Sequence, residues 1–223
     1  MKIIYEDRDI LVVYKEAGLA VESARITSPD LVSILKKHLV RTAAAGQKGD
    51  PSYLAVVHRL DQPVEGIMVF AKTKKAGAEL SKQVQNGVME KIYRAGVALK
   101  TESIPGPGEK VMLTDYLVRD GRTNLTKVAA EGTKDAKKAV LEYTLLEKNE
   151  KDALLEVHLY TGRPHQIRVQ LSHAGMPIRG DRKYGGEEQK ESELRFPALK
   201  AYRLSFKHPA TGKRMSFCTD DCE

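Results

Sequence analysis

The 223-residue sequence has no long apolar run, and this absence excludes one class of protein. A helix that crosses a membrane needs about 18 or more consecutive apolar residues, and no such stretch occurs. The first residues, MKIIYEDRDILVVYK, also interrupt their apolar segments with charges at residues 6–9, unlike the apolar core of a secretory signal. We therefore expect a soluble, cytoplasmic protein with no membrane-spanning segment.

The sequence is also poor in cysteine and in recognisable ligand motifs. Its two cysteines, Cys218 and Cys222, have no second thiol pair or nearby imidazole to complete a tetrahedral metal site. We expect two reduced thiols and no metal. The glycine-containing segment 101–110 lacks the GxxxxGK[ST] spacing that wraps backbone amides around a phosphate, so it is predicted to be an ordinary turn.

Positive charge is in moderate excess. Lysine and arginine number 37 against 30 acidic residues, which gives a formal net charge of +7. A surface of this kind attracts polyanions, because the summed field of the protein favours ligands of the opposite sign. RNA, DNA and an anionic membrane are all compatible with this charge.

Short apolar segments bounded by turn residues dominate the chain and predict β-strands. They lie at residues 9–15, 54–58, 66–72, 91–99, 140–147, 153–160 and 198–206. Helices are predicted at residues 29–40, 73–87 and 163–175, and loops at 41–53, 101–110 and 119–136. No repeat or linker divides the chain, so the pattern predicts an α+β fold. We expect one domain, residues 1–223, with an extended mixed, mainly antiparallel β-sheet flanked by helices and loops.

One carboxylate stands where a predicted strand gives way to a turn. Asp61 follows His58-Arg59-Leu60 and precedes Pro63. It could form an Asx-type turn with the backbone near Pro63, or it could carry chemistry at the edge of the sheet. The second interpretation gains support from residues 160–186, which gather imidazoles, cationic side chains and another loop aspartate.

Two long segments resemble the RluA-type pseudouridine synthase family. Residues 58–72 are similar to its HRLDxxTSGxxxxAK stretch, and residues 161–185 are similar to TGRxHQIRxHLAxxGxPIxGDxxYG. Residues 91–95 match the KxYxA segment, and the opening and closing segments, 6–19 and 202–217, are also similar. The resemblance therefore spans nearly the whole chain and implies the pseudouridine synthase fold with a central active-site cleft.

The resemblance implies a reaction on RNA. A uridine in structured RNA, a stem-loop of ribosomal or transfer RNA, would become pseudouridine when the N1–C1′ bond breaks, the base turns and C5 bonds to C1′. No external cofactor and no metal are implied. A monomer is expected, with the catalytic domain alone and without the S4 RNA-binding domain that many relatives carry.

Particular residues take roles through this resemblance. Asp61 is expected to be the essential carboxylate, as nucleophile or as base, and Arg168 to hold it in a salt bridge. Tyr93 is expected to lie against the flipped uracil, where an aromatic ring replaces lost stacking. Arg59 is expected to enter the RNA beside the target base. The other RNA-binding candidates are Arg163, Lys74 and Lys75.

Several neighbouring residues are expected to support the site without reacting. His58, His165 and Gln166 are predicted to fix local hydrogen bonding, and Asp181 to cap backbone amides. Where the family usually has Thr-Ser, this chain has Val64-Glu65, and Gln170 replaces a usual histidine. We expect these departures to affect which RNA loop is accepted.

Two other functions are compatible with the residues. The chain could be a non-catalytic RNA-binding or ribosome-assembly factor in which the altered Val64-Glu65 loop prevents turnover. Alternatively, Asp61 could pair with Glu65 or Asp181 as a hydrolytic carboxylate pair acting on glycosides, although the positive charge fits this poorly.

Overall fold

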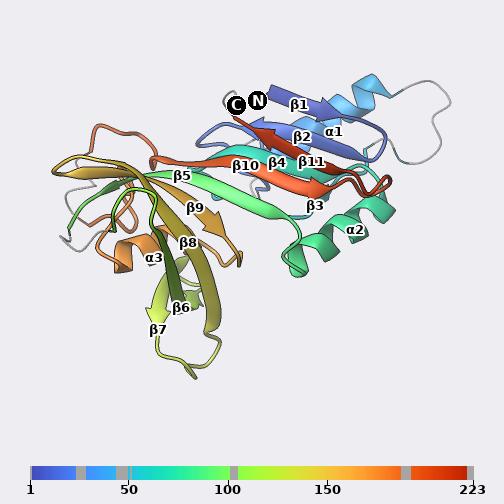
Figure 1. Ribbon diagram of the computed structural model, residues 1–223. Coiled ribbons are helices and arrows are strands. Elements are labelled where there is room, and N and C mark those ends of the chain that lie inside the picture. Colours follow the sequence, from blue (N-terminus) through green and yellow to red (C-terminus); the bar gives the residue numbers. More distant parts are fainter. Residues whose placement is uncertain are drawn as a thin grey trace. The chain divides into compact units, whose positions relative to one another are not determined.

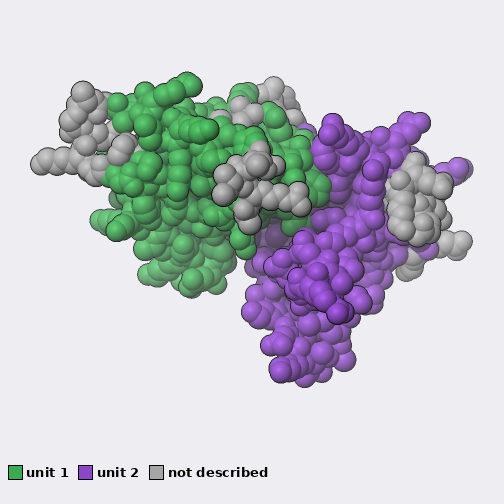
Figure 2. Space-filling view, turned by 180° about the vertical axis from the view of Figure 1, so that it is seen from behind, with its two compact units in different colours: residues 1–89, 203–223 green, residues 90–202 purple. Residues whose placement is uncertain are grey.

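The computed structural model describes residues 2–23, 29–43, 50, 52–100, 105–186 and 192–219. The chain divides into two compact units (Figure 2). Unit 1 contains residues 1–89 and 203–223, and unit 2 contains residues 90–202. One strand, β10 (Leu199–Lys207), begins in unit 2 and ends in unit 1.

Unit 1 is built on strands in the order β1-β2-β4-β10, with β3 paired to β4 and β11 paired to β10 (Figure 1). The pairs β1–β2, β2–β4, β3–β4 and β10–β11 are antiparallel. Its strands besides β10 are β1 (Lys2–Glu6), β2 (Ile10–Lys15), β3 (Ala55–Val56), β4 (Glu65–Ala71) and β11 (Arg214–Cys218). Its helices are α1 (Leu31–Thr42) and α2 (Lys74–Gln85).

The centre of unit 1 is apolar on both faces of the sheet. Ile10–Val13 of β2 are fully buried in succession, and Gly66 to Ala71 of β4 are also buried. Such unbroken burial explains why these segments read as continuous apolar runs instead of alternating ones. Helix α2 packs Ala76 and Leu80 into the cluster on one face, and Thr73 begins this helix by accepting a hydrogen bond from the Ala76 amide.

Unit 2 is an antiparallel sheet with the order β5-β9-β8-β6-β7. Its strands are β5 (Glu90–Ala98), β6 (Lys110–Asp120), β7 (Leu125–Ala129), β8 (Lys137–Lys148) and β9 (Asp152–Leu159). Its helix α3 (Gln166–His173) packs Val169 against Leu117 and Ala139 on β6 and β8. The helix therefore lies on the face formed by the odd-numbered residues of these two strands.

The predicted fold class is confirmed, and most predicted elements are present. The three helices lie within two or three residues of the expected ranges at their starts, and α3 is shorter than the predicted 163–175. The predicted loop 119–136 is wrong in part, because β6 continues to Asp120 and β7 occupies Leu125–Ala129. β7 is a short edge strand, Leu-Thr-Lys-Val-Ala, in which two polar residues interrupt the apolar ones, so it gives little apolar signal in the sequence. Residues 44–49 and 51 of the predicted loop 41–53, and 101–104 of the predicted turn 101–110, lie outside the described residues.

The expectation of two reduced thiols is wrong for Cys218, which is disulfide-bonded. Cys222, the other cysteine of the sequence, lies outside the described residues. Among the helices that the structure describes, none combines the length and the apolar character that spanning a bilayer requires.

Candidate active site

Asp61 lies on a turn that is closed by the backbone. Its carbonyl oxygen accepts a hydrogen bond from the Val64 amide at 3.0 Å. Pro63, two residues after Asp61, has no amide hydrogen, so it cannot be the donor of an Asx-type turn. The turn is therefore closed by a backbone hydrogen bond and not by a bond from the Pro63 nitrogen to the Asp61 carboxylate. The Asp61 side chain is half-buried.

A second loop of unit 1 holds this turn in place. The Gly18 amide donates to the Gln62 carbonyl at 2.9 Å, and the Gln62 side-chain amide donates back to the Gly18 carbonyl at 3.0 Å. Gly18 has a φ of 86°, in the left-handed region that glycine adopts without steric cost. The pair of hydrogen bonds fixes the Asp61 turn against the loop that follows β2.

Lys15 joins these two loops from inside the unit. Its side chain is fully buried, and Nζ donates to the carbonyl oxygens of Glu16 at 3.1 Å, Leu19 at 2.8 Å and Gln62 at 3.0 Å. Burial lowers the pKa of Lys15 to about 8, and the negative charge of Asp61 opposes this shift. The buried ammonium thus positions the turn and contributes positive potential at the Asp61 carboxylate.

Lys15 is a supporting residue that no motif of the sequence indicated. The available signal was a cationic residue at the end of the continuous apolar strand ILVVYK, where burial of a charge requires partners. Glu65, one of the departures from the family pattern, also favours the charged form of Lys15. The negative charge introduced there is therefore balanced within unit 1.

Tyr93 lies on β5 in unit 2, on the buried side of an alternating strand. It is 6% exposed and faces Val157 of β9 across the sheet. Lys91 is on the same side, and burial lowers its pKa. A Cβ added at Gly162 would lie 3.7 Å from the Lys91 Nζ, so the lysine head group lies against the loop that leads into α3.

Arg168 projects from α3 into a buried ion pair with Asp181. Its Nε lies 2.7 Å from Oδ2 and its Nη2 lies 2.8 Å from Oδ1, while Arg168 is 5% exposed and Asp181 is fully buried. The Asp181 carboxylate also accepts hydrogen bonds from the amides of Lys183 and Tyr184. The prediction that Asp181 caps backbone amides is confirmed, and its contact with Arg168 is an addition that the sequence did not indicate.

The predicted salt bridge between Arg168 and Asp61 would join unit 2 to unit 1, and it stays a prediction. The same holds for the approach of Tyr93 to Asp61. Within unit 2, the Tyr184 ring lies beside the Arg168 guanidinium, with 5.1 Å between the guanidinium carbon and the ring centroid. The Asp181 carboxylate and the Tyr184 ring therefore both contact the Arg168 guanidinium and fix its position.

The supporting residues make the local hydrogen bonds expected of them. His58 accepts from the Val69 amide at 3.2 Å, and the His165 ring contacts the Tyr184 hydroxyl at 2.6 Å. Gln166 accepts from the Thr161 hydroxyl and donates to the Val140 carbonyl. The predicted structural roles of His58, His165 and Gln166 are therefore confirmed.

Gln170, which replaces a usual histidine of the family, is fully buried in α3. Its side-chain amide donates to Asp115 at 2.8 Å and to the Ala139 carbonyl at 3.3 Å. It also accepts from Gln166 at 2.9 Å. Gln170 thus hydrogen-bonds α3 to β6 and β8, and it fixes the helix that carries Arg168.

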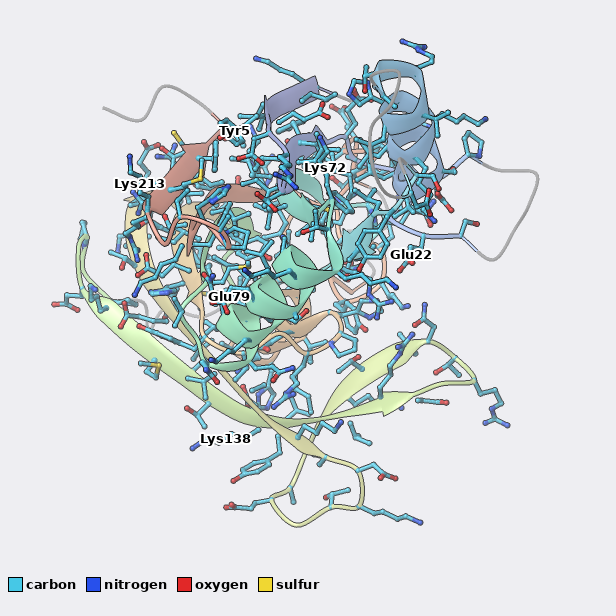
Figure 3. The ribbon with its side chains drawn as sticks, turned by 90° about the vertical axis from the view of Figure 1, so that its right-hand side faces the viewer. Tyr5, Glu22, Lys72, Glu79, Lys138 and Lys213 are labelled. Carbon is cyan, nitrogen blue, oxygen red and sulfur yellow. The ribbon has the colours of Figure 1, made fainter. Side chains whose placement is uncertain are left out.

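The RNA-binding candidates are on or near the surface. Arg59 is exposed, and its Nη1 lies 3.8 Å from a carboxylate oxygen of Glu22, which is labelled in Figure 3. Lys74 and Lys75 are exposed in the first turn of α2. Arg163 donates from Nε to the carbonyl of Lys138 at 3.0 Å. Contact of these four residues with RNA stays a prediction.

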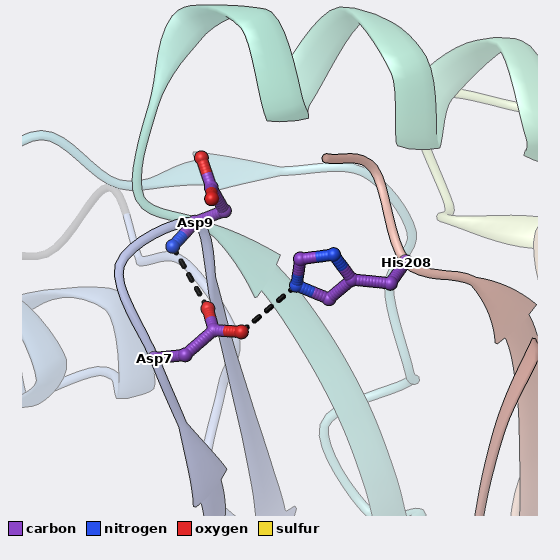
Figure 4. Close-up of side chains that lie close together, drawn as sticks. All are labelled: Asp7, Asp9 and His208. Carbon is purple, nitrogen blue, oxygen red and sulfur yellow. Dashed lines mark hydrogen bonds and ion pairs between the residues drawn. The ribbon is translucent and has the colours of Figure 1, made fainter. Parts of the chain in front are cut away.

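A group of potential metal ligands lies elsewhere in unit 1. The ligand atoms of Asp7, Asp9 and His208 all lie within 4.8 Å of one another (Figure 4). The Asp7 carboxylate already accepts from the amides of Asp9 and Ile10 and from the Tyr5 hydroxyl. Its fourth contact, 2.8 Å long, is with Nε2 of His208.

The hydrogen bonds of the His208 ring define which of its nitrogens carries the proton. Its Nδ1 accepts hydrogen bonds from the amides of Ala210 and Thr211, so Nε2 carries the proton and donates to Asp7. Burial opposes ionisation of Asp7, but the hydrogen bonds to its carboxylate outweigh this effect and lower its pKa. We interpret the group as a structural clasp between the β1–β2 turn and the turn that follows β10.

Comparison with known proteins decides the family. Residues 9–173 match the family model described as RNA pseudouridylate synthase. The chain belongs to this family. A protein of Aquifex aeolicus named "Uncharacterized RNA pseudouridine synthase" is 35% identical, over 100% of this chain and 70% of that protein. "Ribosomal large subunit pseudouridine synthase D" of Pseudomonas aeruginosa is 34% identical, over 97% of this chain and 67% of that protein.

Other relatives are longer still: the chain spans 65% of a similar protein from Mycoplasma pneumoniae and 57% of one from Neisseria meningitidis. Among solved structures, "Human RNA Pseudouridylate Synthase Domain Containing 4" has a TM-score of 0.76 at 22% identity, over 98% of this chain and 88% of that one. "Human RNA Pseudouridylate Synthase Domain Containing 1" has a TM-score of 0.74 at 22% identity, over 99% and 83%. The pseudouridine synthase fold and the predicted enzyme class, an isomerase, are thus confirmed.

Proposed function

We propose that this protein converts specific uridines of structured RNA into pseudouridine, with Asp61 as the essential carboxylate. The observation that carries the proposal is the support of the Asp61 turn by Lys15, whose buried ammonium bonds three carbonyl oxygens, one of them in that turn. A reacting group must be held in a fixed geometry, and a buried cation bonded to the same loop provides this. Residues 1–223 act as a single catalytic domain in this proposal.

The chemistry requires a carboxylate that stays ionised near a polyanion. The N1–C1′ bond of the target uridine breaks, the base rotates, and C5 bonds to C1′. The C5 proton is then lost and N1 gains a proton, so that product and substrate are isomers. Asp61 acts as nucleophile at the sugar or as base, and carboxylates are suited to both roles at a glycosidic centre.

Arg168 is proposed to form a salt bridge with Asp61. Its Nε and Nη2 are engaged with Asp181, which orients the planar group. Guanidinium remains charged at any physiological pH and holds carboxylates in a defined geometry. Tyr93 is proposed to stack on the uracil that leaves the RNA helix, a contact of about 1–3 kcal/mol.

Large-subunit ribosomal RNA is the first substrate to test, because relatives from Pseudomonas aeruginosa and Neisseria meningitidis are named ribosomal large subunit pseudouridine synthases. Transfer RNA is the second. Arg59, Arg163, Lys74 and Lys75 are proposed to contact the RNA backbone. Val64-Glu65 replaces the usual Thr-Ser, and this pair is proposed to affect which RNA loops the protein accepts as substrates.

Tritium release tests the activity. We expect the protein to release tritium from C5-labelled uridine in transcribed large-subunit ribosomal RNA, and Asp61→Asn to abolish the release. Asp135→Asn is the matched control, because Asp135 is exposed and has a φ of 63°, which asparagine tolerates. Release by Asp61→Asn at the rate of the parent protein would contradict the proposed role of Asp61.

The same experiment separates the alternatives. RNA binding by the parent protein without any tritium release from ribosomal or transfer RNA would favour a non-catalytic RNA-binding factor. Release of free uracil would favour a glycoside hydrolase. For the latter, Asp181 is a poor second acid, since it is fully buried and bonded to Arg168 and to two backbone amides.

A further inference from the structure

Cationic side chains gather where the turn between β6 and β7 meets the loop after Asp181. Four of them are exposed: Arg119, Arg122, Arg182 and Lys183. We propose that these four residues, here called the turn surface, bind phosphates of the RNA other than that of the target uridine. This inference rests on the proposed function, because it assumes that the natural ligand is RNA.

Two of these side chains converge on one residue of the turn. The Arg119 guanidinium donates to the side-chain oxygen of Asn124 at 2.6 Å, and the Lys183 ammonium donates to the Asn124 carbonyl. Asn124 has a φ of 53°, which an asparagine tolerates in a tight turn. The structure thus brings cations from β6 and from the loop before Tyr184 to the same place, although they are far apart in the sequence.

The other two cations of the turn surface are not used to hold the fold. Within the residues that the structure describes, the side chains of Arg122 and Arg182 make no hydrogen bond or ion pair; only their backbone amides do. Exposed guanidinium groups in this state are available to phosphate oxygens, which they bind in a planar, bidentate geometry.

The acidic residue of the β6–β7 turn, Asp120, lies on the other face of the hairpin from Arg119. Asp120 accepts hydrogen bonds from the Thr123 hydroxyl and from the Arg122 amide, and these contacts lower its pKa. In the β6–β7 register Asp120 opposes Leu125, whereas Arg119 opposes Thr126. Because alternate residues of a strand face opposite sides, Asp120 and Lys127 share one face and Arg119 lies on the other.

The turn surface is also fixed to the scaffold that holds Arg168. The Thr126 amide donates to the Tyr184 hydroxyl at 2.9 Å, and this hydroxyl contacts the His165 ring just before α3. Tyr184 in turn lies beside the Arg168 guanidinium. RNA bound at the turn surface would therefore be held at a defined position relative to Arg168 within unit 2.

Topology makes this region accessible to a large ligand. Strand β7 is the edge strand of the unit 2 sheet. Figure 3 shows the β6–β7 hairpin as two pale green strands joined by a turn. A regularly charged polymer such as RNA can contact an exposed turn of this kind through its backbone, without entering a pocket.

The test measures how RNA affinity depends on salt. The double variant Arg122→Gln/Arg182→Gln is compared with the parent protein by fluorescence anisotropy, using a fluorescein-labelled RNA stem-loop with uridines in its loop. If each arginine neutralises one phosphate, the slope of log affinity against log salt becomes shallower by about 1.4–1.8. Affinity at low salt falls on the order of tenfold.

The matched control is Lys127→Gln. Lys127 is exposed on the same hairpin but on the face that it shares with Asp120, outside the turn surface. Its removal is expected to change the slope by less than half of one phosphate contact, about 0.4 or less. A double variant with the slope of the parent protein would overturn the inference, as would a Lys127→Gln variant that loses as much slope as the double variant.

A second pair of variants tests the anchored half of the turn surface. Arg119→Gln/Lys183→Gln is expected to weaken RNA binding, and Arg119→Lys/Lys183→Arg, which keeps both charges, to restore most of it. Recovery with the charge-keeping pair separates phosphate binding from a merely structural role. Failure of these experiments is distinguishable from failure of the proposed function, which would appear as no tritium release by the parent protein.

Discussion

Arg168 and Asp181 form an edge-on ion pair in which Nε lies 2.7 Å from Oδ2 and Nη2 lies 2.8 Å from Oδ1. Both side chains are almost completely removed from solvent. Two charges in such a place stabilise each other only as a pair, because each alone would be buried without compensation. The proposed partner of Asp61 is therefore itself positioned by a second carboxylate from the loop after α3.

Substitution of Asp181 tests this arrangement. Asp181→Asn removes the carboxylate that the buried guanidinium bonds within unit 2, and we expect the free energy of unfolding to fall by about 3–5 kcal/mol. Tritium release should fall strongly in the fraction that remains folded, because Arg168 loses its fixed orientation. Urea denaturation and the tritium assay measure the two effects. The control Asp135→Asn should change neither, and an Asp181→Asn variant with the parent's stability would show that the pair is dispensable.

Lys15 should give the protein two opposite responses to alkaline pH. The pKa of this side chain is lowered from 10.5 to about 8 on folding, so between these values the unfolded chain binds more protons. The contribution of Lys15 to the free energy of unfolding therefore rises with pH across this window. Activity should fall over the same range, because the neutral amine donates two hydrogen bonds where the ammonium donates three, and the Asp61 turn loosens.

Lys15→Met is the variant that isolates this effect. It fills a similar volume and has no proton to lose, so both pH trends should disappear. At neutral pH we expect activity to fall more than tenfold, since three carbonyl oxygens lose their donor and the Asp61 turn loses its support. Urea denaturation and single-turnover tritium release between pH 7 and about 10 provide the readouts. Identical pH profiles for the two proteins would show that Lys15 does not act as described.

Gly180 should not tolerate any side chain. It has a φ of 72°, and a Cβ added there would lie 2.7 Å from both the Cβ of Leu194 and the carbonyl oxygen of Phe196. We expect Gly180→Ala to lower the free energy of unfolding by about 3 kcal/mol or more, from backbone strain and overlap together. Gly132→Ala is the control: its φ is 85° but no atom lies within 4 Å, so only the strain of about 1 kcal/mol should appear. Equal losses would refute the role of close packing at Gly180.

The clasp around Asp7 should contribute to stability without a metal. Asp7→Asn weakens the contact with His208 and should cost about 1–3 kcal/mol. Because folding lowers the pKa of Asp7, its contribution is present above the ordinary carboxyl pKa of 3.8 and is lost as the pH falls below that value. Thermal unfolding with added zinc or manganese should give the same Tm as with a chelator. A Tm raised by either ion, and not raised in Asp7→Asn, would instead indicate a metal site.

Much of the fold could be predicted because apolar runs and helix signals are local. The buried strands β2 and β4 are continuous apolar segments, and Thr73 marks the start of α2. Strand β7 was missed because a short edge strand with few apolar residues depends on pairing with β6 for its formation. The disulfide state of Cys218 was likewise not a property that spacing could establish.

The sequence by itself determined the family, and it led to the prediction that Asp61, Tyr93 and Arg168 form the site, because long motifs carry the family's characteristic residues. Only the tertiary structure decided how these residues are supported. Three sets of contacts join segments that are distant or irregular in the chain. They are the hydrogen bonds of Lys15 to its three acceptors, the ion pair of Asp181 with Arg168, and the hydrogen bonds of Arg119 and Lys183 to Asn124. Burial and hydrogen-bond geometry arise when such segments pack together, and no local pattern of residues records them.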